Sequence, residues 1–326
     1  MILMNHHKLH AQMNSLGRRR QPFLWGITYD MERGFISPEP FDDSEVLWHV
    51  GDDGNHSHLE ADRKPEMQIR RHIGIESYGA MFDTVMRGLR RGDSFLTNLT
   101  AATEVSLKGS LRDVFLSSSA PYRLLIGDSF VCFSPEIFVV IEGRRISTFP
   151  MKGTADAARS DAVQYLLDNY KETCEHYTIV DLMRNDLNMV ASDICVKRFR
   201  YAEKIATTSG AIIQTSSEIA GLLPEGKEYD FGDIILPLLP AGSISGAPKE
   251  ATTALIKRAE TFPRGWYTGV FGYFDGVRMT TAVMIRCLQR HVDGTLRFHS
   301  GGGITVNSDV AEEYQEIIDK IYLTLS

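Results

Sequence analysis

Short apolar runs separated by turn residues dominate residues 95–149. The clearest runs cover 122–126, 130–141 and 145–149, and Gly127-Asp128 and Glu142-Gly143 stand between them as turns. Helical periodicity intervenes only irregularly, so the strict alternation of strand and helix that marks a parallel sheet is missing. This pattern constrains the fold more than any other feature, and it predicts antiparallel sheets.

The rest of the chain is also predicted to combine strands with irregularly spaced helices. Apolar residues recur at helical spacing over 78–89, Gly92 supplies a stop, and a C-terminal helix is predicted to begin near Asp309. Other helices are expected at 111–118, 161–185, 231–239 and 249–258, and other strands at 23–27, 95–100, 194–201, 210–218, 267–274, 280–289 and 295–299. The predicted fold class is α+β.

A polar stretch near the N-terminus is the best candidate for a linker. It covers 51–65 and contains Gly51, Gly54 and Pro65. We therefore expect residues 1–65 to form a short strand-rich segment that packs on a main domain of residues 66–326.

Composition excludes several kinds of partner. The net charge is -7 at pH 7, so the chain has no basic excess for nucleic acid or an anionic membrane. No apolar run approaches the roughly 20 residues that cross a bilayer. Its 4 cysteines show no CxxC spacing and are typical of reduced thiols, so we expect a cytoplasmic protein.

One lysine in a turn rich in proline and glycine precedes a helix rich in acids. Lys152 lies in Pro150-Met151-Lys152-Gly153-Thr154, and the following segment to residue 186 carries Glu172 and Glu175. From these residues alone, two interpretations are open. The amine is either a nucleophile beside a metal site or part of a solvated ion-pair network.

Charged or flexible residues at three other places suggest a ligand site. A proline inside the expected strand at 130–141 predicts an edge or bulge, which would turn Glu136 toward a cleft. Arg286 lies in an apolar strand, where a buried charge is costly without a carboxylate partner or ligand. Gly301, Gly302 and Gly303 allow backbone N–H groups to approach an anion closely.

Several of these motifs, in this order, resemble those of the chorismate-utilising enzymes. They are the segment around Lys152, the segment 175–186 ending in Val180-Asp181-Leu182-Met183-Arg184-Asn185-Asp186, Gly246-Ala247-Pro248-Lys249, Ile285-Arg286 and Gly301-Gly302-Gly303-Ile304. The likeness covers roughly Tyr78 to the C-terminus. It implies two antiparallel sheets packed together and flanked by helices, with 66–326 as the chorismate-binding catalytic domain. Within the family it is greatest to the aminodeoxychorismate synthases, because anthranilate synthases typically carry alanine at the position of Lys152.

The resemblance also implies a reaction. Lys152 would attack C2 of chorismate and displace the C4 hydroxyl, and ammonia would then enter at C4 and expel the lysine. The attacking amine must be neutral, whereas a free lysine has a pKa of about 10.4, so burial or nearby positive charge is needed. Glu136 would be the general acid that protonates the leaving hydroxyl.

A magnesium site and a set of substrate contacts follow from the same resemblance. Glu175 and Glu316 match the metal-binding glutamates of the family, with Glu172 as a supporting ligand, and Mg²⁺ prefers such oxygen ligands. The implied substrate-binding residues are Arg286, Tyr273, Gly301, Gly302, Gly303, Lys249 and Thr154.

Departures from the family pattern reduce the number of reactions that this chain is expected to catalyse, but they leave alternative functions open. Leu96 stands where the members that add water carry a lysine base, so those reactions are disfavoured, and Thr280 replaces a common acidic residue. We expect amination of chorismate at C4 to 4-amino-4-deoxychorismate, with ammonia from a separate glutamine amidotransferase subunit, since no glutaminase signature is evident. The alternatives are an anthranilate synthase component I and a non-catalytic chorismate-binding subunit. The short N-terminal region makes tryptophan binding doubtful.

Overall fold

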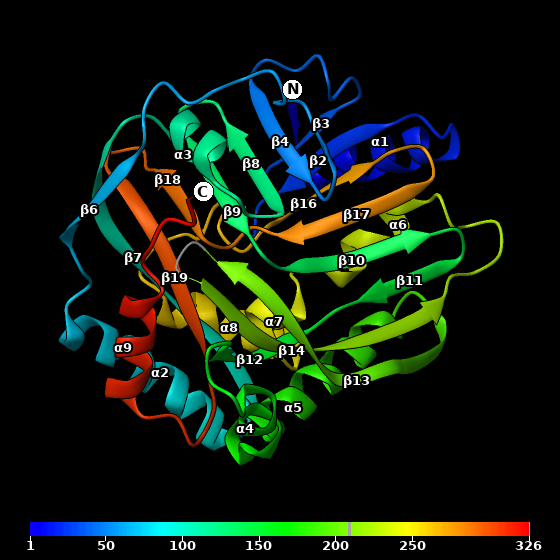
Figure 1. Cartoon of the computed structure of the whole chain (residues 1–326). Coiled ribbons are helices and arrows are strands. Elements are labelled where there is room, and N and C mark those ends of the chain that lie inside the picture. The colour runs from blue at the N-terminus through cyan, green and yellow to red at the C-terminus, as the bar shows by residue number, and fades with distance from the viewer. Residues whose placement is uncertain (208–209, 326) are drawn as a thin grey trace.

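Two antiparallel sheets form the centre of the molecule in the computed structural model (Figure 1), which describes residues 1–207 and 210–325. Buried side chains from both sheets, among them Leu24 and Trp48, belong to one hydrophobic cluster, so the sheets face each other. The strand pairs within each sheet are antiparallel. The predicted α+β class with two packed antiparallel sheets is confirmed.

The strand order of each sheet brings distant segments together. The first sheet runs β1 (Ile2–Met4), β3 (Gly34–Ser37), β2 (Phe23–Ile27), β16 (Val270–Phe274), β17 (Arg278–Val283), β10 (Ile137–Glu142), β11 (Arg145–Thr148), β14 (Gly210–Leu222) and β12 (Met151–Asp156), and β13 (Ser192–Thr207) pairs with β14. The second runs β15 (Gly246–Ala247), β7 (Leu96–Lys108), β19 (Leu296–Ile304), β18 (Cys287–Arg290), β9 (Phe130–Ser134), β8 (Tyr122–Ile126), β4 (Val46–Val50) and β5 (Asp53–Gly54), and β6 (Glu66–Arg71) pairs with β7.

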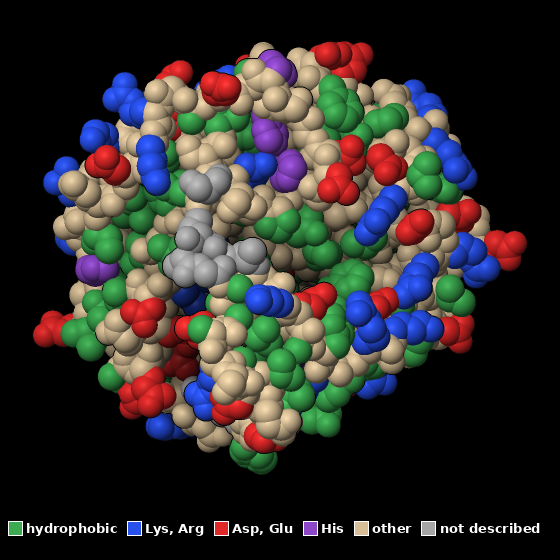
Figure 2. All heavy atoms as spheres, viewed as in Figure 1, with side chains coloured by type: hydrophobic (Ala, Val, Ile, Leu, Met, Phe, Trp, Pro, Cys, Tyr) green, Lys and Arg blue, Asp and Glu red, His purple; other side chains and the backbone are tan. Residues whose placement is uncertain are grey.

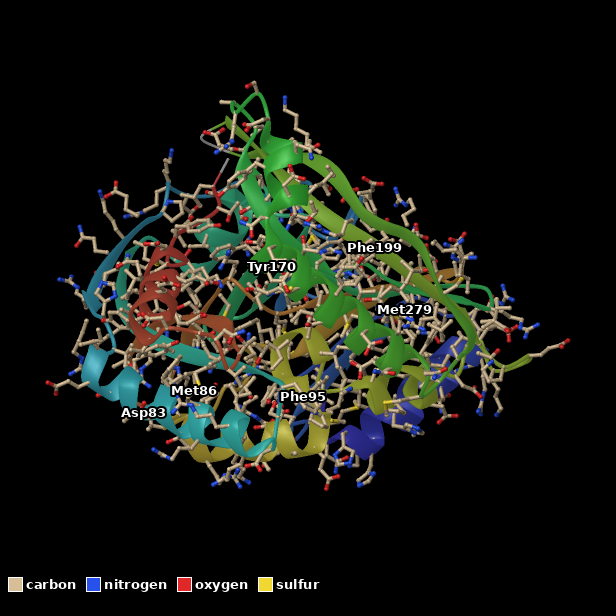
Figure 3. The ribbon with its side chains drawn as sticks, turned by 90° about the horizontal axis from the view of Figure 1, so that it is seen from below. Asp83, Met86, Phe95, Tyr170, Phe199 and Met279 are labelled. Atoms are coloured by element: carbon tan, nitrogen blue, oxygen red, sulfur yellow. The ribbon has the colours of Figure 1, made fainter. Side chains whose placement is uncertain are left out.

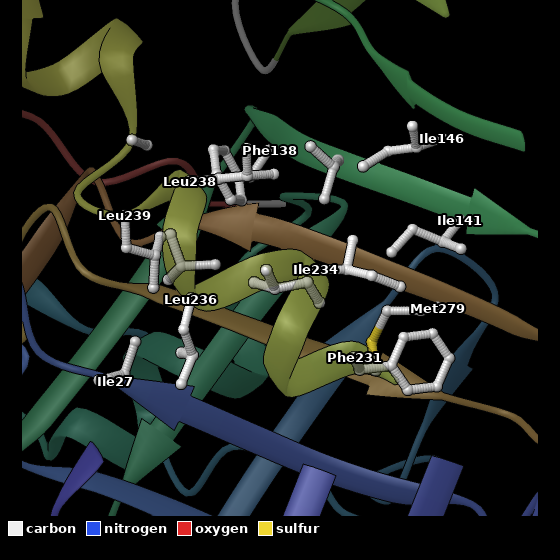
Figure 4. Close-up of a cluster of buried hydrophobic side chains, with 14 of the residues drawn as sticks. Ile27, Phe138, Ile141, Ile146, Phe231, Ile234, Leu236, Leu238, Leu239 and Met279 are labelled. Carbon is white, nitrogen blue, oxygen red and sulfur yellow. The ribbon is translucent and has the colours of Figure 1, made fainter. Parts of the chain in front are cut away.

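Helices cover the outer faces of both sheets. Those on the first sheet are α1 (His6–Arg18), α4 (Ala162–Asp168), α5 (Tyr170–Leu187), α6 (Phe231–Ile235) and the 3-10 turn η1 (Leu236–Leu238). The short helix α7 (Gly242–Ser245) contacts α5 and also β7 and β15 of the second sheet. Those on the second are α2 (Ile75–Arg91), α3 (Leu111–Ser117), α8 (Lys249–Ala259) and α9 (Val310–Asp319). Figure 4 shows Phe231 and Ile234 of α6 beside Met279 of β17, within the outer core of the first sheet. No helix in the described part of the chain is long and apolar enough to cross a membrane.

The two helices with the clearest sequence signals form as predicted. In α2 the buried residues recur every three or four positions, and Gly92 ends the helix in the left-handed conformation with φ of 80°. Asp309 begins α9 by accepting hydrogen bonds from the N–H groups of Ala311 and Glu312. Figure 3 shows α2, marked by Asp83 and Met86, on one side of α5, which begins at Tyr170.

Three elements predicted as continuous are broken in the structure. The expected strand 130–141 divides at Pro135 into β9 and β10, and the expected strand 280–289 divides near Arg286 into β17 and β18. The expected helix 161–185 divides at Asn169, whose side chain caps α5 by accepting from the N–H of Glu172. Pro135 and Asn169 stand at two of these breaks, whereas Met284 and Ile285 continue the apolar run at the third, where periodicity alone does not reveal the break.

The first 65 residues are woven into both sheets. Strand β2 pairs with β16 in the first sheet, whereas β4 pairs with β8 in the second. Residues 1–65 therefore supply strands to both sheets. Helix α1 was not predicted, although its buried residues Leu9, Met13 and Leu16 have helical spacing.

Asn55, inside the predicted linker, is a buried hydrogen-bonding centre. Its amide donates to the carbonyl oxygens of Pro40, Asp43 and Val46, and its own oxygen accepts from the N–H of Trp48. Asn55→Ala is expected to lower the free energy of unfolding by about 3 kcal/mol, because it leaves buried polar groups unpaired. Denaturant titration measures this loss. Ser57→Ala, an exposed neighbour, should change stability little, and an equal loss in both variants would contradict the assignment.

Candidate active site

Two crossings of the chain between the sheets lie side by side. One leads from β9 to β10 through Pro135 and Glu136, and the other leads from β17 to β18 through Ile285 and Arg286. Because β9 pairs with β18 and β10 pairs with β17, the two crossings must be neighbours. The backbone N–H of Val283 also donates to the backbone carbonyl oxygen of Glu136 at 3.1 Å. The pairing thus brings a half-buried carboxyl group and a half-buried guanidinium group to one place.

A cavity of about 190 Å³ opens at these crossings. Figure 2 shows acidic side chains set into a recess on this face of the molecule, over the region of β12 and α9. The lining residues are Leu96, Asn98, Glu136, Pro150, Met151, Lys152, Ile179, Ser243, Ile244, Gly246, Tyr267, Ile285, Arg286, His299, Gly301, Gly302, Gly303, Glu316 and Lys320. Predicted residues from five separate motifs therefore meet in a single cavity.

Glu136 is a carboxyl group in the cavity lining that lies near a hydroxyl group and several cations. Its Oε1 accepts a hydrogen bond of 2.6 Å from the Ser243 hydroxyl of α7. Loss of solvation raises the pKa of Glu136, while the Ser243 hydrogen bond and the positive charges of Lys152, Arg286 and Lys320 oppose this rise. A carboxyl group in this setting holds its proton more readily than an exposed one and can donate it to a ligand.

Ser243→Ala is expected to raise the pKa of Glu136 further. The serine hydroxyl stabilises the charged carboxylate, so its loss favours the protonated form. Carbon-13 NMR titration of the Glu136 carboxyl group measures the change. Ser243→Thr, which keeps a hydroxyl, is the matched control, and a lower pKa in the alanine variant would contradict this account.

Lys152 lies on a bulged strand rather than in the predicted turn. The pairing of β12 with β14 shifts register between Lys152 and Thr154, where Gly153 has φ of 78°. Such a bulge turns a side chain out of the regular alternation. Lys152 Nζ lies 3.2 Å from Glu175 Oε2 of α5, and a Cβ atom on Gly153 would come within 3.0 Å of Glu172 Oε2. Glu172 and Glu175, the two acidic residues predicted as metal ligands on α5, therefore lie beside β12, the strand that carries Lys152.

A second lysine, which sequence analysis did not single out, adds positive charge. Lys320 lies one helical turn beyond Glu316, at the end of α9, and its Nζ lies 2.5 Å from Glu316 Oε1 and 2.8 Å from the Gly301 oxygen. Burial lowers the pKa of Lys320, Arg286 and Lys152 add to this effect, and Glu316 opposes it. The sequence did contain a signal for Lys320: it follows Glu316 by four residues, and residues at this spacing share one face of a helix.

The glycines at 301–303 allow side chains to approach the strand closely. A Cβ atom on Gly302 would lie 3.2 Å from Glu313 Oε2, and one on Gly301 would lie 3.1 Å from the Tyr267 hydroxyl. Glu313 is buried beside Glu316 on α9 and was also missed by sequence analysis. The backbone of β19 thus forms one wall of the cavity, and the predicted approach of its N–H groups to an anion stays a prediction.

Three predicted substrate-binding residues lie outside the cavity lining. Tyr273 packs in the core between the sheets, with its ring centroid 4.3 Å from that of Trp48. Lys249 binds Asp186 at 3.1 Å and the Leu238 oxygen at 2.6 Å, and Thr154 is exposed on β12. Tyr267 and His299 line the cavity instead. The predicted contact of Tyr273 with substrate is therefore not supported.

Carboxylate oxygens beside the cavity suit Mg²⁺ as ligands, but they do not form a complete cage. Glu175 and Glu316 each lie against a lysine, at 3.2 Å and 2.5 Å. Within the described ranges, no three His, Cys, Asp or Glu side chains are gathered so that they could hold a metal. These residues fit an ion that keeps several waters and takes other ligands from substrate.

Comparison with known proteins agrees with this geometry. The chorismate binding enzyme model matches residues 32–326. An uncharacterized PabA-like protein of Pasteurella multocida is 47% identical over 322 residues, which cover 98% of this chain and 99% of that protein.

Two relatives with more specific names are longer. Anthranilate synthase component 1 1 of Haloarcula marismortui is 34% identical, and the match covers 75% of this chain and 52% of the relative. Aminodeoxychorismate synthase component 1 of Salmonella typhimurium is 32% identical, and the match covers 75% of this chain and 56% of the relative. The chain thus spans about half the length of these synthases.

A solved structure shares the fold. Anthranilate synthase component I from Streptococcus pneumoniae superposes with a TM-score of 0.64 at 25% identity, over 81% of this chain and 60% of that one. The family match extends over most of the sequence and includes every predicted catalytic and metal-binding residue. The chain therefore belongs to the chorismate binding enzyme family.

Proposed function

We propose that this protein aminates chorismate at C4 to give 4-amino-4-deoxychorismate, and that Lys152 is the nucleophile. The observation that carries the proposal is the position of Lys152 in the lining of the same cavity as Glu136 and Arg286. An amine, an acid and a guanidinium are the groups that addition to a ring, departure of a hydroxyl and binding of a carboxylate require.

The proposed reaction has two displacements. Lys152, as a neutral amine, forms a bond to C2, the double bonds of the ring shift, and the C4 hydroxyl leaves as water with the proton of Glu136. Ammonia then forms a bond to C4, the double bonds shift back, and the bond between C2 and Lys152 breaks. Ammonia loses a proton as its bond forms, which returns one to Glu136.

Chorismate is a dianion, and the cavity offers cations for it. Arg286 suits bidentate binding of one carboxylate, and Lys320 supplies a second positive charge on another wall. Glu175 and Glu316 would hold Mg²⁺ with a substrate carboxylate and waters, which would add positive charge at the ring carboxylate. Glu172 lies beside Gly153 as a supporting group.

Leu96 supports amination over addition of water. It lines the cavity beside Gly303, where a Cβ atom would approach Leu96 Cδ1 to 3.1 Å. An alkyl side chain cannot take a proton from water, so this wall offers no base. We propose that ammonia comes from a glutamine amidotransferase subunit when glutamine is the donor.

Anthranilate synthase component I is the second candidate. It is favoured by the relative of Haloarcula marismortui, whose identity of 34% slightly exceeds the 32% of the aminodeoxychorismate synthase from Salmonella typhimurium. Identity therefore does not separate the two reactions, whereas Lys152 distinguishes them because a ring-attacking amine has no part in amination at C2 by ammonia alone.

The product identifies the reaction. Purified protein is incubated with chorismate, Mg²⁺ and ammonium, with aminodeoxychorismate lyase added. We expect 4-aminobenzoate. Fluorescent anthranilate in its place would transfer the protein to the second candidate, and chorismate binding without turnover, even with an amidotransferase supplied, would favour a non-catalytic subunit.

A further inference from the structure

A buried ion pair lies directly behind the catalytic cavity. The side chains of Arg264 and Glu260 are 1% and 4% exposed, and two hydrogen bonds of 2.6 Å and 2.9 Å join them. Burial of two charges carries a desolvation penalty of several kcal/mol per ion, so stability alone does not explain such a pair.

The pair ties together two walls of the cavity. Arg264 Nη1 donates to the Ile244 oxygen of α7 at 2.9 Å, and Nη2 donates to the Asn98 oxygen of β7 at 2.7 Å. Ile244 and Asn98 both line the cavity. Glu260 Oε1 accepts from the N–H and the hydroxyl of Thr100, also on β7, at 3.0 Å and 2.9 Å.

Helix α7 depends on such contacts. It has only 4 residues, too few to be stable alone, so its position is set by the groups that bind it. Asp186, which pairs with Lys249, lies against its first residue, Gly242. Its second residue, Ser243, donates to Glu136.

We propose that Arg264, fixed by Glu260, is a positioning residue for Glu136: it holds α7 so that Ser243 aims the carboxyl group of Glu136 at bound substrate. The inference rests on the proposed function only in its assignment of Glu136 as the proton donor. A guanidinium suits this task because its planar fork spans two acceptors, whereas a lysine ammonium is a single point.

The test compares two substitutions of the same kind. Arg264→Lys keeps a cation beside Glu260 but cannot reach both Ile244 and Asn98. Arg123→Lys is the matched control, because Arg123 is also buried and bonds two carbonyls, those of Phe115 and Ser118, that do not line the cavity. Rates of chorismate consumption are measured at a temperature well below the midpoints of thermal unfolding of both variants. We expect Arg264→Lys to lower kcat roughly 10- to 100-fold with a smaller change in KM, and Arg123→Lys to leave kcat near that of wild type.

A double-mutant cycle tests the route through Ser243. If Arg264 acts through α7, Arg264→Lys adds little to the loss already caused by Ser243→Ala. Fully additive losses, or a wild-type kcat in Arg264→Lys, would overturn the proposal.

An NMR measurement separates failure of this inference from failure of the proposed function. If wild type consumes no chorismate, the proposed function fails, but titration of the Glu136 carboxyl group remains possible. We expect Arg264→Lys to shift that titration in the same direction as Ser243→Ala, and Arg123→Lys to leave it unchanged. Identical titrations in wild type and Arg264→Lys would refute the positioning role.

Discussion

Lys152→Ala is expected to lower kcat for formation of 4-amino-4-deoxychorismate by about 10³-fold or more. The variant lacks the atom that forms the bond to C2, and loss of a covalent nucleophile removes a whole reaction path. Arg286 and Lys320 remain to bind the substrate, so KM should change far less than kcat. The lyase-coupled assay under saturating chorismate measures both constants.

The control for this variant is Lys204→Ala, which removes an exposed lysine from β13. It should leave kcat unchanged. Binding of chorismate to the Lys152 variant, measured by calorimetry, verifies that the cavity is intact. A Lys152→Ala enzyme that keeps more than a tenth of wild-type kcat would exclude a nucleophilic role, because ammonia would then be reacting directly.

Glu136→Gln is expected to lower kcat by about 10²- to 10⁴-fold, the usual contribution of a general acid. The amide preserves size and still accepts the Ser243 hydrogen bond, but it cannot donate an acidic proton to the leaving hydroxyl. Glu142→Gln, at the exposed end of β10, is the matched control and should be neutral.

The role of Glu136 as a proton donor also predicts the direction in which kcat changes with pH. Burial raises the pKa of Glu136 above the ordinary carboxyl value. Because the protonated form of Glu136 is the active one, wild-type kcat should fall as the pH rises through this raised pKa. The residual activity of Glu136→Gln should lack that fall. An unchanged pH profile in the variant would assign the titration to another group.

Local signals predicted most elements but not their assignment to sheets. Helix α2 and the start of α9 follow from apolar spacing, Gly92 and Asp309, which act within one or two turns. The proline at 135 predicted an edge or bulge, but the passage of the chain from one sheet to the other, at Pro135 and near Arg286, was not predicted. That passage depends on pairing with strands distant in the sequence.

In the candidate site, too, local motifs predicted some residues, whereas the position of others depends on the tertiary structure. Glu136, Lys152, Arg286, Glu316 and the glycines at 301–303 were found from motifs, and they line one cavity. Tyr273 lies in the core instead of in the cavity lining, because a motif does not say which face of β16 its side chain occupies. Lys320, Tyr267 and Ser243 were missed, although Lys320 follows Glu316 by four residues, because their place in the cavity depends on the tertiary structure.

The sequence by itself determined the antiparallel character of the fold, the family, and the kinds of chemical group available for the reaction, because turn residues, apolar periodicity and motifs are local. Only the tertiary structure decided which groups meet. The proximity of Glu136 to Arg286 arises from strand pairing across 150 residues, and the support of α7 by Arg264 arises from a fork that reaches two walls at once. Such contacts depend on the position of whole elements, which no short stretch of sequence specifies.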